Sequence, residues 1–269
     1  MVYRTCLENK SLARDREFES HLLRQLLTAL NMSCFLLHEV RFELWYTCIK
    51  YMKLTFAYDE EKDIECLLSK GGGSKNSPGQ RTKTYDELLL WTSNLQDQEE
   101  VKNFVRDYIQ KNKLDIQQTI INVQKNWDGI SERFEICAER VFGVKITYDI
   151  TAYLTITGRY PYNIQDKFFY VSAKKQNANE TAMHELWHFY TWLAVGDREK
   201  EIGAQKYNDI KEALTVLLNT ECKDLMGDGI DNGYPQHAGL RNMILNAWKK
   251  TKDIKMVWAA MDTHHPREN

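Results

Sequence analysis

Two histidines and a glutamate in this chain have the types and spacing of a catalytic metal site. The segment TAMHELWHFYTW, residues 181–192, contains His184, Glu185 and His188. On an α-helix, residues four apart lie on one face, roughly 6 Å from each other. Two imidazoles there can bind one tetrahedral metal through ring nitrogens about 2.1 Å from it. Glu185 projects about 100° around the helix from His184, so it can accept a proton from a water that attacks a carbonyl carbon.

A third ligand is needed, and the segment KEALTVLLN supplies Glu212. The run HExxHxxGxxH is excluded because Ala194 occupies the position of its last histidine. Glu212 instead interrupts an apolar helical face, which is formed by Ile210, Leu214 and Leu217. A carboxylate beside apolar side chains is costly unless it has a partner. A metal ion would be such a partner.

Other interpretations of Glu212 stay open. It could lie at the boundary of the core and pair with a neighbouring lysine, Lys206 or Lys211. Glu221 and Asp224 are weaker candidates for the third ligand.

Together, His184, Glu185, His188 and Glu212 resemble the zinc site of the gluzincin metallopeptidases, the thermolysin-like division of the zincins. The match covers residues 179–218 and includes the Glu-Ala pair at the ligand glutamate. The resemblance implies one Zn2+ ion held by the two histidines and Glu212. It also implies hydrolysis of peptide bonds in a peptide or protein substrate, through a metal-bound water activated by Glu185.

The same resemblance extends to groups around the metal. Tyr234 and His237, in the segment GYPQHAG, follow the third-ligand helix in the order in which the family places its oxyanion-stabilising residues. The alternative is a solvated loop with a turn tyrosine and an exposed histidine. The family also binds the substrate backbone by adding it to an edge strand. Residues 166–172, just before the histidine helix, are the expected edge strand, although an ordinary buried strand fits Phe168 and Phe169 equally well.

One position departs from the family. Thermolysin-like enzymes usually have an aspartate four residues after the ligand glutamate, where it supports a ligand histidine. Val216 occupies that position here. We therefore expect the support to come from Thr215, Asn219 or a backbone carbonyl.

The elements that must position these residues can be expected from hydrophobic periodicity. Apolar residues at helical spacing predict helices, and stretches rich in β-branched and aromatic residues predict strands. An antiparallel pair of strands is expected over residues 144–158 and 166–173. Helices are expected over residues 101–109, 114–142 (ending at Gly143), 179–195, 207–222 and 240–250. The predicted fold is α+β and zincin-like: mostly helical, with a small sheet beside the active-site helix.

Composition shifts divide the chain into three parts. Residues 1–51 are either upstream sequence translated from a wrong start codon or a helical hairpin packed on the rest. Residues 52–83 form a lead segment that contains a Gly/Ser-rich loop at 69–80. Residues 84–269 are the expected zincin-like metallopeptidase domain.

Charge and cysteine content limit the class of protein. The formal net charge is -2, with 43% hydrophobic and 28% charged residues, so there is no electrostatic reason to expect nucleic acid or a membrane as a partner. The N-terminal stretch lacks the apolar core of a signal peptide, which favours the cytoplasm. The six cysteines form no CxxC pair, and we expect reduced, buried thiols.

Two further functions remain open. The first is a non-catalytic metal-binding or structural protein on a zincin scaffold, which the departure at Val216 favours. The second is a helical interaction protein that binds no metal.

Overall fold

The computed structural model describes residues 52–68 and 98–264. The expectations for residues 1–51 and for the loop at 69–80 lie outside this part. By its internal contacts the chain divides into residues 1–50 and 51–269, and every described residue belongs to the second unit. Within the described ranges, no helix has the length and apolar character needed to cross a membrane.

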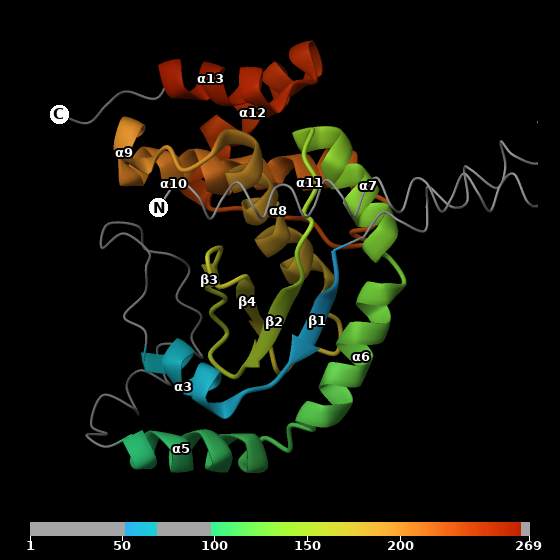
Figure 1. Ribbon diagram of the computed structural model, residues 1–269, viewed down its shortest axis with the longest axis vertical. Coiled ribbons are helices and arrows are strands. Elements are labelled where there is room, and N and C mark those ends of the chain that lie inside the picture. Colours follow the sequence, from blue (N-terminus) through green and yellow to red (C-terminus); the bar gives the residue numbers. More distant parts are fainter. Residues whose placement is uncertain (1–51, 69–97, 265–269) are drawn as a thin grey trace, which may run out of the picture. The chain divides into compact units, whose positions relative to one another are not determined.

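A four-stranded sheet, in the order β1-β2-β4-β3, lies at the centre of the described part (Figure 1). Its strands are β1 (Leu54–Ala57), β2 (Ile150–Thr155), β3 (Tyr162–Asn163) and β4 (Phe168–Ser172). Strands β1, β2 and β4 run parallel, and only β3 pairs in the antiparallel sense, with β4. The predicted antiparallel pair is therefore wrong. The chain does not fold back directly after Gly158 but first forms β3 on the far side of β4.

The edge of the sheet also differs from the expectation. The segment expected to be the edge strand is β4, which lies between β2 and β3. β3 is the edge strand, and it pairs only with Phe168 and Phe169. Tyr170 adds one hydrogen bond from its N–H to the carbonyl of Pro161. At the other edge, β1 comes from the lead segment and pairs with β2, so residues 54–57 belong to the same sheet as β2, β3 and β4.

Helices make up most of the described part, so the fold is α+β. They are α3 (Glu60–Leu68), α5 (Gln98–Lys111), α6 (Ile116–Asp128), α7 (Ser131–Phe142), α8 (Asn179–Val195), α9 (Glu199–Ile202), α10 (Ala204–Leu214), α11 (Leu218–Glu221), α12 (Ala238–Thr251) and α13 (Ile254–His264). Two 3-10 turns, η1 (Thr215–Leu217) and η2 (Pro235–His237), complete the set.

Two predicted helices are interrupted in the structure. The expected helix 114–142 is divided into α6 and α7 at Gly129 and Ile130, where the Ile130 N–H bonds to the carbonyl of Trp127 and φ of Ile130 reaches -127°. The expected helix 207–222 is divided by η1 into α10 and α11. In both predicted helices the helical spacing of apolar residues continues across the interruption. Such a pattern does not show where a helix tightens or bends.

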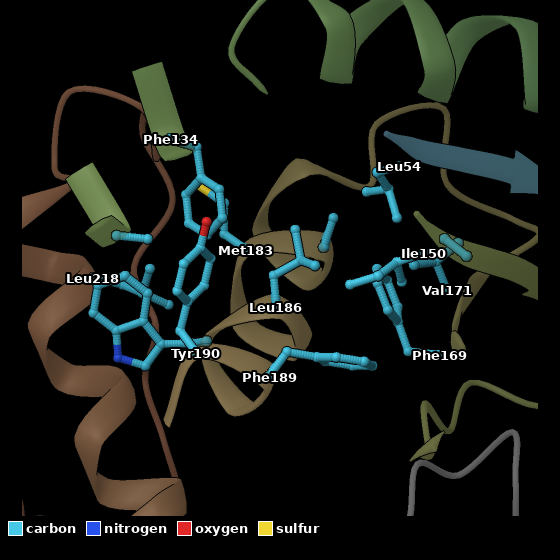
Figure 2. Packing of buried hydrophobic residues seen from close by; sticks show 14 of the residues in the cluster. Leu54, Phe134, Ile150, Phe169, Val171, Met183, Leu186, Phe189, Tyr190 and Leu218 are labelled. Carbon is cyan, nitrogen blue, oxygen red and sulfur yellow. The ribbon is translucent and has the colours of Figure 1, made fainter. Parts of the chain in front are cut away.

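Helix α8 is the centre of the hydrophobic core. It contacts β4, α6, α7, α10 and α13, and its apolar residues between Ala182 and Tyr190 are all 0% exposed. Figure 2 shows Leu186 and Phe189 directed at the strand residues Ile150 and Phe169. Helix α8 also presents Met183 and Tyr190 to Phe134 and Leu218, so it is packed from two sides (Figure 2).

The cysteines differ from the expectation of reduced thiols. Cys137 of α7 and Cys222, which follows α11, form a disulfide across 85 positions of sequence, with Cα atoms 6.3 Å apart. Cys66 is a buried thiol outside this disulfide, as expected for a small apolar residue. The disulfide was missed because sequence spacing alone does not show which distant residues become neighbours.

A buried carboxylate on α3 fastens this helix to the end of β2. Asp63 is 0% exposed, and its Oδ1 accepts hydrogen bonds from Thr155 Oγ1 at 2.7 Å and from the Ile156 N–H at 3.1 Å. Burial outweighs these bonds and raises the pKa of Asp63 to about 6. Between roughly pH 4 and 6 the unfolded chain has lost this proton while the folded chain retains it. The free energy of unfolding should therefore fall as pH rises through this range.

Replacement of Asp63 with asparagine should remove this loss of stability. Asparagine keeps an Oδ1 acceptor for both hydrogen bonds and carries no charge to desolvate. We expect Asp63→Asn to gain about 2 kcal/mol relative to the wild type between pH 4 and pH 7. Urea unfolding at both pH values measures this difference. A difference between the two proteins that is the same at pH 4 and pH 7 would contradict the prediction.

Candidate metal centre

Two helices bring the three predicted ligands together. Helix α8 supplies His184 and His188, and α10 supplies Glu212. A buried hydrogen bond of 3.1 Å from Trp187 Nε1 to the carbonyl of Leu214 joins α8 to the end of α10. The apolar neighbours predicted for the glutamate, Ile210, Leu214 and Leu217, are all 0% exposed. Core packing therefore fixes the position of the carboxylate relative to the imidazoles.

The ligand atoms converge as a tetrahedral metal site requires. His184 Nε2 and His188 Nε2 are 3.2 Å apart. Glu212 Oε2 lies 3.5 Å from His184 Nε2, and Oε1 lies 3.5 Å from His188 Nε2. Bonds of about 2.1 Å in a tetrahedron separate neighbouring ligand atoms by roughly 3.4 Å. These three residues could therefore hold a metal ion, with one ligand atom from each within 4.8 Å of the other two.

The orientation of His184 depends on Asp231, a residue that the sequence did not indicate. Asp231 Oδ2 lies 2.6 Å from His184 Nδ1, so the other ring nitrogen, Nε2, is turned toward the ligand cluster. Burial alone would lower the pKa of His184, but the hydrogen bonds to Asp231 and Glu212 outweigh it and raise that pKa. His188 differs, because its Nδ1 is buried without a hydrogen-bond partner among the residues described.

A polar network holds Asp231 in place. Its Oδ1 accepts from Thr215 Oγ1 and from Arg241 Nη1, each at 2.8 Å. Asn219 bonds to the backbone of Asp231 through both its amide oxygen and its amide nitrogen, at 2.8 Å each. Thr215 and Asn219 were expected to support the histidine directly. They instead support the carboxylate that does so.

Gly233 makes room for this network. Its φ is +60°, a conformation that residues with a side chain rarely adopt, and an added Cβ would lie 2.3 Å from Arg241 Nη1. The absence of a side chain thus lets the buried guanidinium approach the loop that carries Asp231.

Removal of the Asp231 charge should weaken metal binding. In Asp231→Asn, the amide can keep its oxygen toward Thr215 and Arg241, so its nitrogen would face His184 Nδ1 and the acceptor would be lost. We expect zinc affinity to fall about 10- to 100-fold, measured by competition with a chromophoric chelator. Asp224→Asn is the matched control, since this aspartate is 68% exposed and pairs with Arg133. Equal affinity in both variants would contradict the role of Asp231.

Glu185 lies beside the ligand cluster without being part of it. It is 6% exposed and makes no hydrogen bond to any residue in the described ranges. Burial is the main reason why the pKa of Glu185 is raised to about 8, and the negative charge of Glu212 adds to this rise. The neighbouring cations act in the opposite direction. A carboxylate without hydrogen-bond donors has its oxygens available to a substrate or to water, as a general base requires.

Lys211 brings a buried cation to the same cluster. Its side chain is 8% exposed, and its Nζ lies 3.1 Å from Glu212 Oε1 and 2.6 Å from the hydroxyl of Tyr162. The Tyr162 ring also packs against the imidazole of His188, with centroids 5.0 Å apart. The lysine partner considered from the sequence is therefore present, and it accompanies the two histidines around Glu212. Lys206 is directed elsewhere and pairs with Asp262.

The structure places the two predicted oxyanion-stabilising residues differently. Tyr234 is partly buried, and burial, together with the charges of Glu212 and Glu185, raises its pKa to about 12. His237 is buried, with Nε2 2.9 Å from Asp209 Oδ1. The alternative interpretation, in which this histidine is exposed in a solvated loop, is therefore wrong. The catalytic role of His237 stays a prediction.

The two weaker ligand candidates lie outside the cluster. Glu221 binds Trp248 Nε1 at 2.7 Å and Lys252 Nζ at 2.8 Å, and Asp224 pairs with Arg133.

Comparisons of this chain with protein-family models, with curated proteins and with solved structures found no match. The interpretation of the site therefore depends on its own geometry.

Proposed function

We propose that this protein is a zinc-dependent metallopeptidase with a zincin-like fold. The observation that supports this most directly is the convergence of His184, His188 and Glu212, whose ligand atoms, one from each residue, lie within 4.8 Å of one another. Glu185 lies next to them and forms no hydrogen bond within the described ranges. This combination suits hydrolysis better than a purely structural metal site, in which a fourth protein ligand usually closes the coordination.

Zinc, when bound, would lower the pKa of a coordinated water and polarise the substrate carbonyl. The residues of the chain then have separate tasks. Glu185 accepts a proton from the attacking water while the water oxygen bonds to the carbonyl carbon. The electron pair of the C=O bond moves to the carbonyl oxygen. Glu185 then transfers this proton to the leaving nitrogen as the C–N bond breaks. Asp231 keeps His184 in the tautomer that leaves Nε2 free for the metal.

The substrate would bind along the sheet edge that faces this centre. β3 covers only Phe168 and Phe169, and β4 continues to Ser172. The β4 residues from Tyr170 to Ser172 are buried, whereas the edge strand β3 is only partly buried. An extended peptide would therefore pair with the outer side of β3. This favours peptides over small molecules as the substrate class.

A non-catalytic metal-binding protein on the same scaffold is the second candidate. The pairing of His237 with Asp209 favours it, because this histidine is thereby engaged away from a substrate.

Metal analysis and a cleavage screen together test the proposal. Protein purified without chelators should contain about one equivalent of zinc and should cleave members of an unbiased peptide library. Chelation should stop the cleavage and added zinc should restore it. Zinc retention without any cleavage would favour the second candidate, and less than about half an equivalent of zinc would exclude both.

A further inference from the structure

Tyr162 and Lys211 form a pair beside the ligands that the peptidase chemistry described so far does not use. Tyr162 lies on the edge strand β3, and Lys211 precedes Glu212 on α10. The lysine Nζ lies 2.6 Å from the Tyr162 hydroxyl oxygen and 4.7 Å from the centre of its ring. Both contacts are held in a fixed place, because the lysine side chain is 8% exposed and the tyrosine ring packs on His188.

The direction of this hydrogen bond follows from the donors available. A lysine ammonium has three N–H donors and no acceptor, whereas a tyrosine hydroxyl can donate and accept. The oxygen of Tyr162 therefore accepts from Lys211, and its own O–H remains to donate elsewhere. No residue in the described ranges provides an acceptor for this proton. A hydroxyl that accepts a bond from a cation is also a stronger donor, because the bonds polarise each other.

The position of the hydroxyl suits a reacting carbonyl. The Lys211 nitrogen that bonds Tyr162 also lies 3.1 Å from Glu212 Oε1, so a single ammonium group separates the hydroxyl from a metal ligand. Tyr162 is also on β3, the edge strand of the sheet. A peptide paired along that edge would pass this hydroxyl on its way to the ligands.

We propose that Tyr162, positioned by Lys211, donates the hydrogen bond that stabilises the oxyanion during peptide hydrolysis. This inference rests on the proposed peptidase function. As water adds to the carbonyl carbon, the C=O electron pair moves onto the oxygen, and Tyr162 donates to that oxygen while keeping its proton. When the C–N bond breaks, the electron pair returns to re-form the carbonyl. Such donors act mainly in the transition state, so they raise kcat more than they lower KM.

The test compares zinc-loaded full-length wild type with Tyr162→Phe, using one cleaved peptide and a phosphinic analogue of it. The phosphinic group is a tetrahedral anion that imitates the intermediate. We expect Tyr162→Phe to lower kcat about 100-fold with KM changed less than about 3-fold. Its affinity for the phosphinic analogue should fall by a similar factor, and its zinc content should not change.

A second tyrosine–lysine pair provides a matched control. Tyr108 of α5 has its hydroxyl 2.5 Å from Lys174 Nζ, and this nitrogen lies 4.8 Å from the ring centre. Tyr108→Phe should leave kcat and analogue affinity as in the wild type.

Three results would overturn the inference. An active wild type with an equally active Tyr162→Phe overturns it alone and leaves the peptidase proposal standing. A loss confined to Tyr234→Phe assigns the oxyanion to that tyrosine instead. A zinc-loaded wild type that cleaves no peptide overturns the proposed function, and this inference with it.

Discussion

Replacement of Glu185 with glutamine should leave zinc bound and reduce kcat for peptide hydrolysis about 1,000-fold. Glutamine has nearly the same size as glutamate but cannot accept the proton of the attacking water. The converging ligand atoms belong to His184, His188 and Glu212, so the substitution changes none of them. When both are measured on the same preparation, the zinc stoichiometry should therefore stay at the wild-type value while kcat falls.

A control and a stability measurement make this result specific. Glu180 lies in the first turn of the same helix and is exposed, so Glu180→Gln should retain wild-type kcat. The pKa of Glu185 is raised to about 8 in the folded protein without metal, mainly by burial. The metal-free wild type should therefore lose stability as pH rises from about 4 toward 8, because the unfolded chain loses this proton first.

Glu185→Gln should abolish that loss, so the metal-free variant should unfold at higher urea concentration than the wild type near pH 8. Loss of activity combined with greater stability is the pattern expected of a functional residue held at a cost to folding. A variant that loses zinc together with activity would instead place Glu185 among the ligands.

Local sequence patterns account for a large part of the site. The histidine helix was predicted over residues 179–195, and α8 has these bounds. Its apolar residues and the stop at Gly196 are encoded within the segment itself. The position of Glu212 could be predicted for the same reason, since a carboxylate among Ile210, Leu214 and Leu217 indicates that a buried polar partner must be near.

Contacts between distant segments could not be predicted in this way. Asp231 meets His184 across 47 positions, and it lies in a glycine-rich loop whose composition indicates only a turn. The parallel pairing of β2 and β4 has a similar explanation. Gly158 and Pro161 indicate a turn region between the two segments, but they do not say whether the chain returns at once or adds β3 first.

The histidine pair without its carboxylate should bind zinc poorly. In Glu212→Gln a neutral amide replaces the charged ligand, and three or four ligands share a zinc binding free energy of about 10–16 kcal/mol. Loss of one ligand should thus weaken binding on the order of 100- to 1,000-fold. We expect zinc to raise the Tm of the wild type, and this rise should largely disappear in the variant at micromolar zinc.

Glu221→Gln is the matched control for this variant. Glu221 lies in α11, nine residues further along, and is hydrogen-bonded to Trp248 and Lys252. The zinc affinity of Glu221→Gln should therefore equal that of the wild type. Both variants should remain folded without metal, because α8 and α10 are fixed by core residues such as Trp187 and Leu214 rather than by the ion. Wild-type zinc affinity in Glu212→Gln would mean that another group completes the site, and the catalytic arrangement around Glu185 would then have to be rebuilt on that group.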